Sequence, residues 1–238
     1  MRLSRIYQHT NLQAGAVVTL DERASHYLLH VLRVKVGYSL ILFDGVGHSA
    51  EAVVNECNRK TVTVTIKTCF VEEVESPLKI HLYQGVCRGE KMDFVIQKAV
   101  ELGVTAITPL LTERCQLSLD DKRRENRLEH WQQVIISACE QSGRSTLPVL
   151  HSFKNFSDYT ASQQAIVLHP EARQTLSKIS IQQSCDLLIG PEGGFTDPEI
   201  EHLTSNKVMP VSLGARVLRS ETAGLAAVSV LQALAGDF

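Results

Sequence analysis

Two glycine-containing loops carry the side chains best suited to chemistry in this chain of 238 residues. The first loop, Gly190-Pro191-Glu192-Gly193-Gly194, follows the apolar run 187–189. Glycines at the carboxyl end of a parallel strand let the backbone turn sharply and approach a ligand closely. The loop matches neither common phosphate-binding glycine pattern, and Glu192 would repel a polyphosphate. A ligand with hydroxyl groups or a positive charge suits it better, although the same residues could form only a tight turn.

The second loop, residues 214–223, follows another apolar run and contains Arg216 and Arg219. Between them, Val217 and Leu218 are suited to form an apolar wall of a pocket for a flat ring. Arg219 would add a fixed positive charge at the same strand end. The alternative interpretation of the two arginines is that they form salt bridges on the surface.

Signals for helix starts follow both loops. Thr196 with Glu199 three residues later predicts a capping box. Ser220 is suited to cap a helix that begins at Glu221, whose carboxylate fits the positive end of that helix.

A third turn, Leu168-His169-Pro170, closes a further expected strand. A histidine before proline is more often structural than catalytic.

The elements that must position these loops change in character along the chain. After residue 77, strands and helices alternate, which is typical of a mostly parallel sheet covered on both faces. Strands are expected at 78–86, 106–111, 165–168, 185–189 and 209–213, and helices at 90–102, 121–141, 198–204 and 221–234. Residues 1–72 instead contain one helix at 22–32 and short β-branched segments at 16–20, 39–43, 51–54 and 61–67, which favours a small β-barrel or sandwich. The acidic segment 73–77, ended by Pro77, is expected to be a linker.

Composition limits the possible functions. The chain has 24 basic and 26 acidic residues, so RNA binding would need local basic patches such as residues 1–36. Its six cysteines form no C-x-x-C pair, which favours reduced thiols in a cytoplasmic protein. His26 and His30 lack a third ligand nearby in sequence, so no metal site is expected. No apolar run reaches the roughly 18 residues that span a bilayer, and no hydrolase motif is present.

Together the two loops resemble those of the RsmE family, the 16S ribosomal RNA uridine-N3 methyltransferases of the SPOUT superfamily. Nearly the whole chain shares this similarity, which also includes residues 30–37, 42–45, 88–92, 97–98, 101–104, 113–115 and 138–144. At position 220 the family pattern leads us to expect threonine. This chain has serine there, and serine also carries a hydroxyl group.

The resemblance implies an α/β protein of two domains. Residues 78–238 would form a SPOUT-type methyltransferase domain with a trefoil knot, and residues 1–72 a PUA-like β-barrel that binds RNA. It also implies a homodimer that uses S-adenosylmethionine, without a metal, to methylate N3 of a specific uridine in 16S rRNA of the small ribosomal subunit.

Roles for individual residues follow from the resemblance. The expected cofactor-binding residues are Leu168, His169, Pro170, Gly190, Pro191, Glu192, Gly193, Gly194, Leu213, Gly214, Val217, Leu218 and Thr222. Arg219 would stabilise negative charge on the uracil, and Glu221 is a candidate proton acceptor whose alternative role is a helix-start carboxylate. The residues expected to hold RNA phosphates are Arg2, Arg5, Arg33 and Lys35 in the first domain and Arg88, Lys91, Arg114 and Arg144 near the catalytic edge.

Three alternatives remain open at this point. One is a non-catalytic RNA-binding factor in ribosome assembly, which the two intact loops disfavour. Another is a SPOUT methyltransferase with a different RNA target or base. The third is a nucleotide-dependent enzyme acting on small molecules. That enzyme would need a phosphate-binding loop at residues 87–91, where only one glycine occurs.

Overall fold

The computed structural model describes residues 3–115, 120–161 and 163–238. Its backbone forms two compact units. One contains residues up to Glu75 together with Cys139–Leu147, and the other contains Ser76–Ala138 with Pro148–Phe238. The N-terminal unit therefore includes nine residues, 139–147, that the sequence-based division at 73–77 assigns to the second domain.

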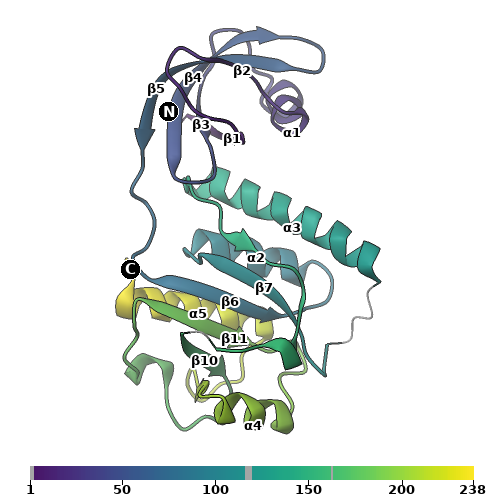
Figure 1. Cartoon of the computed structure of the whole chain (residues 1–238), viewed down its shortest axis with the longest axis vertical. Helices are drawn as coiled ribbons and strands as arrows, with labels where there is room; N and C mark the ends of the chain where they lie inside the picture. The colour runs from purple at the N-terminus through teal and green to yellow at the C-terminus, as the bar shows by residue number, and fades with distance from the viewer. Residues whose placement is uncertain (1–2, 116–119, 162) are drawn as a thin grey trace. The chain divides into compact units, whose positions relative to one another are not determined.

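A five-stranded mixed sheet forms the N-terminal unit, with the strand order β1-β3-β4-β5-β2 (Figure 1). The strands are β1 (Ser4–Tyr7), β2 (Val17–Thr19), β3 (Ser39–Phe43), β4 (His48–Cys57) and β5 (Val62–Val71). Only β1 and β3 pair in parallel, and the other neighbours are antiparallel. The sequence pattern predicts all of these strands except β1, whose four residues are too few to show a clear alternation.

The expected helix at 22–32 is present but changes type along its length. It starts as α1 (Glu22–His26), where the Asp21 carboxylate accepts a hydrogen bond from the Ala24 backbone N–H at 2.7 Å. It continues as a π-helix, η1 (Tyr27–Leu32). Ala24 and Leu28 are fully buried in the core of this unit.

The second unit contains the expected parallel sheet, with seven strands in the order β12-β10-β11-β6-β7-β8 and β9 paired with β7. Its strands are β6 (Lys79–Gly85), β7 (Ala106–Leu111), β8 (Val149–Leu150), β9 (Lys154–Asn155), β10 (Gln164–Leu168), β11 (Ser184–Ile189) and β12 (Met209–Val211). Among the described residues, the strand pairs of this sheet are all parallel, which confirms the fold class predicted from the alternating pattern. The two-residue strands β8 and β9 were not expected.

The helices lie close to their predicted positions: α2 (Lys91–Glu101), α3 (Asp121–Ser142), α4 (Asp197–Ser205) and α5 (Ser220–Ala235), with short 3-10 turns η2 (Phe156–Asp158) and η3 (Leu176–Lys178). Figure 1 shows α2 and α5 packed side by side. Leu203 of α4 packs instead in a separate core with Val167 and Leu188 of the sheet. Within the described ranges, none of the helices has the length and apolar character needed to cross a membrane.

Candidate active site

A cavity of about 610 Å³ lies within the second unit, at the carboxyl ends of three neighbouring strands. β10, β11 and β12 are adjacent in the sheet, so the loops that follow them meet at one edge. The segments that line it are 168–171, 189–195, 211–214 and 216–221, and the remaining lining residues are Lys91, Arg114, Asp197 and Ala223. This volume falls in the range typical of small-molecule sites.

Most of the residues expected from the sequence meet in this cavity. All of the expected cofactor-binding residues line it except Thr222, which is exposed on α5. Arg219 and Glu221, the expected catalytic residues, also line it. Thr222 does not line the cavity, because each helical residue turns by about 100° from its neighbour and the residue after Glu221 points elsewhere.

The glycine loop after β11 folds tightly on itself. A Cβ atom added to Gly190 would lie 3.0 Å from the Cα of Gly194, closer than carbon atoms normally pack. Gly194 itself has a φ of +68°, a left-handed conformation that residues with a side chain adopt at a cost. No heavy atom lies within 4 Å of a Cβ built on Gly194, so the loop presents a bare backbone there.

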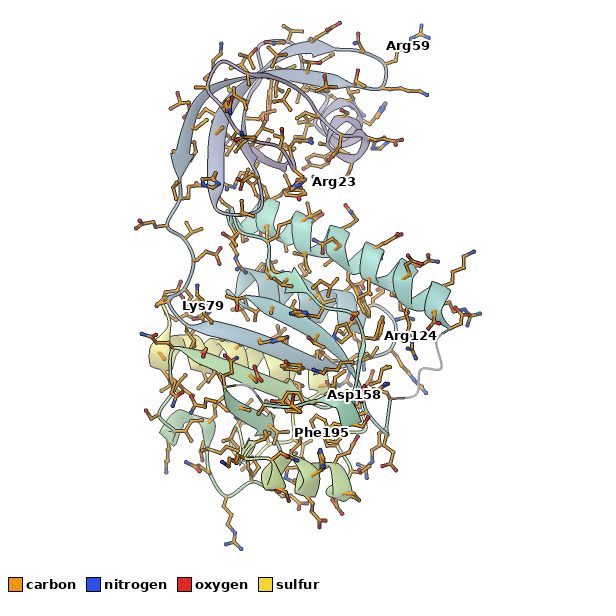
Figure 2. All side chains as sticks on the ribbon, viewed as in Figure 1. Arg23, Arg59, Lys79, Arg124, Asp158 and Phe195 are labelled. Atoms are coloured by element: carbon orange, nitrogen blue, oxygen red, sulfur yellow. The ribbon has the colours of Figure 1, made fainter. Side chains whose placement is uncertain are left out.

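Arg114, which also lines the cavity, holds this loop by hydrogen bonds. Its Nη1 donates hydrogen bonds to the carbonyl oxygens of Gly193 at 2.8 Å and Phe195 at 3.3 Å. Phe195, labelled in Figure 2, is buried and packs in the same core as Leu203 of α4. From the sequence, Arg114 was expected to bind RNA phosphate. In the structure its guanidinium donates hydrogen bonds to the glycine loop instead.

The capping box predicted at the start of α4 is confirmed. The Thr196 backbone N–H donates to a Glu199 carboxylate oxygen at 2.8 Å, and the Glu199 N–H donates to the Thr196 hydroxyl at 3.4 Å. Glu113 extends this arrangement, because its backbone N–H donates to the other Glu199 oxygen at 2.9 Å. The segment after β7 therefore fixes both the glycine loop and the helix that follows it.

Ser220 does not have the role expected of it. The N-cap residue of α5 is Arg219, and Ser220 is the first helical residue. Its hydroxyl donates instead to the Gly190 carbonyl oxygen at 2.5 Å and accepts a hydrogen bond from Gln84 Nε2 at 3.0 Å. Nearby, burial raises the pKa of the Cys87 thiol to about 11, so this cysteine stays protonated and unreactive.

Two carboxylates and one ammonium group meet at the cavity wall. Lys91 Nζ lies 3.2 Å from Glu192 Oε1 and 3.9 Å from Glu221 Oε1. Burial opposes ionisation of Glu192, but hydrogen bonds from the Arg88 backbone N–H and from Lys91 outweigh it and lower the pKa of this carboxyl group. Glu192 is therefore a stable anion at neutral pH.

Glu221 keeps one oxygen available. Its Oε2 is buried and has no hydrogen-bond partner among the described residues. A buried acceptor without a donor is costly, so this oxygen is ready to receive a proton or a hydrogen bond from a ligand. Arg219 at the same wall is exposed and takes part in no ion pair within the described part of the chain.

Apart from Lys91 and Arg114, which lie at the cavity, the expected phosphate-binding residues differ in their exposure to solvent. Arg33, Lys35 and Arg88 are exposed, while Arg2 lies outside the described residues. Arg5 and Arg144 are only 8% and 5% exposed.

Buried ion pairs explain the low exposure of these two arginines. Arg5 Nη2 lies 2.7 Å from Glu72 Oε2, and Arg144 Nη2 lies 2.5 Å from Glu75 Oε2. These contacts neutralise both guanidinium groups inside the N-terminal unit, which disfavours the expected binding of RNA phosphates by Arg5 and Arg144.

Sequence reasoning also missed part of the site. Gln84 is fully buried at the end of β6 and joins the hydrogen bonds of Ser220. Glu171 lines the cavity just beyond the expected Leu168-His169-Pro170 turn. The one available signal for Gln84 was a polar residue at the end of an otherwise apolar strand.

Comparisons with known proteins agree with this site and fold. Residues 74–232 match a family described as the RNA methyltransferase domain, and residues 20–67 match the RNA methyltransferase PUA domain. Fold and site thus define a PUA-containing RNA methyltransferase with a SPOUT-type methyltransferase domain.

Individual relatives identify the family of this chain more specifically. The chain is 36% identical over 241 residues to ribosomal RNA small subunit methyltransferase E of Buchnera aphidicola, covering 99% of this chain and 98% of the relative. A Neisseria gonorrhoeae structure of that enzyme, bound to S-adenosyl methionine, matches with 36% identity and a TM-score of 0.92 over both whole chains. A Legionella pneumophila methyltransferase in complex with the same cofactor matches with 39% identity and a TM-score of 0.95, also over both whole chains. The chain belongs to the ribosomal RNA small subunit methyltransferase E family.

Proposed function

We propose that this protein transfers a methyl group from S-adenosylmethionine to N3 of a specific uridine in 16S rRNA of the small ribosomal subunit. The observation that carries the proposal is the single cavity in which both family loops converge with Glu192, Arg219 and Glu221. Relatives that match this chain over nearly their whole length, and that are named as small-subunit rRNA methyltransferases, support the RNA substrate.

The cavity fits S-adenosylmethionine in shape and charge. Leu168, Leu213 and Leu218 provide apolar surface for the adenine ring, and the bare backbone at Gly194 allows close contact. The anionic Glu192 suits a ligand that carries a sulfonium cation. When bound, this cofactor supplies a methyl group activated for attack by a nucleophile.

The chain's own residues must prepare the nucleophile. Uridine N3 carries a proton that has to leave, and the unpartnered Oε2 of Glu221 is the acceptor we propose. Loss of that proton leaves negative charge spread over N3, O2 and O4 of the base. Arg219, which has no acidic partner in the described structure, stabilises this charge. Correct alignment of the base with the methyl group supplies much of the remaining acceleration.

RNA binding is assigned to exposed cations of both units. In the N-terminal unit these are Arg33 and Lys35, and in the second unit Arg88 beside the cavity. Phosphate contacts of this kind position the RNA without selecting its sequence. From the family we also propose a trefoil knot around the cofactor site, a homodimer and a cytoplasmic location. The proposed reaction uses no metal.

Transfer of a labelled methyl group tests the proposal. Purified protein is mixed with labelled S-adenosylmethionine and small subunits from cells that lack the endogenous enzyme. The proposal expects label in 16S rRNA, with Arg219→Ala and Glu221→Gln lowering kcat by about 10² or more while cofactor affinity changes little. Cofactor and RNA binding without transfer would favour the assembly-factor alternative.

A further inference from the structure

We propose that the surface formed by η1 and the loop after it binds a single-stranded RNA segment by stacking bases on its side chains. We call this surface, made of His26, Tyr27, His30, Val31 and Arg33, the η1 surface. The inference rests on the proposed function and adds to it the kind of RNA that the N-terminal unit holds.

The backbone of this segment is unusual. The Arg33 N–H bonds to the Leu28 carbonyl oxygen, the five-residue spacing of a π-helix, and the helix ends at Arg33 with a φ of 53°. π-Helical turns are rare and occur often at functional sites. A non-glycine residue in the left-handed region also carries a cost. The fold therefore maintains an irregular helix end where a regular α-helix would be less strained.

Side chains that the core does not use cover the outer side of this helix. Tyr27 is 37% exposed and Val31 is 61% exposed, whereas Leu28 between them is fully buried. The rings of His26 and His30, both exposed, lie with their centres 4.6 Å apart. None of these three ring side chains and their apolar neighbour Val31 belongs to the described core of this unit. Flat rings are the surfaces on which unpaired bases stack.

The charge beside these rings fits the same ligand. Arg33, Lys35 and Val36 follow the helix, and all three are exposed. In the part of the chain that the structure describes, neither Arg33 nor Lys35 forms an ion pair. The acidic residues nearest to Arg33 in sequence are Glu22, at the other end of the helix, and Asp44, directly after β3, each eleven positions away. Unpaired cations next to exposed rings complement the backbone and the bases of a single strand. A duplex would hide its bases and leave the rings unused.

Variants at Tyr27 separate stacking from simple charge attraction. Binding of the full-length protein is measured with a short labelled single-stranded RNA and with the same strand annealed to its complement. We expect Tyr27→Leu to weaken single-strand binding about tenfold while duplex binding stays unchanged. Tyr27→Phe keeps the ring and is expected to match the wild type. Combined replacement of His26 and His30 by leucine should give a further loss on the single strand only.

Salt dependence supplies the second readout. Arg33→Gln should reduce the slope of log affinity against log salt by about one, whereas Tyr27→Leu should leave that slope unchanged. Equal binding of the single strand by Tyr27→Leu and Tyr27→Phe would overturn the proposal, as would an equal loss on single strand and duplex. Cofactor affinity and methyl transfer, measured at saturating small subunits, report separately on the proposed function. That function fails if the wild-type protein transfers no label, whatever the Tyr27 variants bind.

Discussion

The Ser220 hydroxyl donates a hydrogen bond to the Gly190 carbonyl oxygen at 2.5 Å. This contact joins the loop after β11 to the start of α5, two segments separated by thirty residues in the chain. Gln84 donates to the same hydroxyl at 3.0 Å from the buried end of β6. A single hydroxyl therefore fixes the spacing of the two cavity walls that carry Glu192 and Arg219.

Removing this hydroxyl should loosen the cavity. Ser220→Ala leaves the Gly190 carbonyl oxygen and Gln84 Nε2 short of a partner, which should cost about 1–3 kcal/mol of unfolding free energy and weaken cofactor binding. Ser220→Thr keeps the hydroxyl and should retain cofactor affinity. Calorimetric titration and thermal unfolding of both variants check this. Unchanged cofactor affinity in Ser220→Ala would show that the contact does not shape the site.

Gly194 should be intolerant of a side chain for a reason specific to the cofactor. Gly194→Val adds about 1–2 kcal/mol of backbone strain at a φ of +68° and fills the open face of the loop. The matched control is Gly15→Val, because Gly15 has a φ of +84° and also has no atom within 4 Å of a built Cβ. Both variants should lose stability, but only Gly194→Val should lose cofactor binding in calorimetry. Normal binding by folded Gly194→Val would contradict the assignment of the glycine loop.

Charge reversal in the N-terminal unit should separate RNA binding from cofactor binding. Arg33→Glu replaces an unpaired cation with an anion and should weaken RNA binding at least tenfold, leaving cofactor affinity nearly unchanged. Arg59 lies at the turn between β4 and β5, where Figure 2 shows it extending away from the sheet, so Arg59→Glu serves as a matched reversal. It should have a much smaller effect in the same titration. If Arg33→Glu weakened cofactor and RNA equally, the division of roles between the units would be wrong.

His81 should make the protein sensitive to mild acid. Burial and the neighbouring His151 and Lys154 lower the pKa of His81 from 6.5 to about 4, and its Nε2 lies 2.8 Å from the Thr108 hydroxyl. Between these two pH values the unfolded chain binds more protons than the folded one. Stability should therefore fall as the pH drops from 6.5 towards 4, by at most about 1.4 kcal/mol per pH unit from this group.

Denaturant unfolding at several pH values measures this effect. His81→Phe removes the titrating group and should flatten the profile relative to wild type, and His9→Phe provides a control at an exposed histidine. Parallel profiles for the wild type and His81→Phe would exclude His81 as the source.

The sequence was most informative where a local pattern decides the structure. Alternating apolar residues and turn signals predicted β3 and β7 at their observed bounds, and the Thr196–Glu199 spacing predicted a capping box. The family resemblance then identified loops that the fold does bring together at one cavity.

What sequence reasoning missed depends on contacts between distant residues. From the sequence, Arg5 is expected to be a cation at the surface. In the structure it is buried, and it donates hydrogen bonds to Glu72 and Ser145, which lie far along the chain. From the sequence, Ser220 is expected to cap a helix. In the structure its hydroxyl donates a hydrogen bond to the Gly190 carbonyl oxygen instead. Neither partner is visible in a local pattern. For the same reason, the assignment of residues 139–147 to the N-terminal unit could not be predicted.

The identity of the methylated nucleoside tests the central claim most directly. After reaction with labelled S-adenosylmethionine, the rRNA of small subunits lacking this modification is digested to nucleosides and separated by mass. The account predicts label in N3-methyluridine at one position, and its loss with Gly194→Val. Label in another nucleoside would retain the methyltransferase but contradict its assigned base, and absence of both label and cofactor binding would contradict the account as a whole.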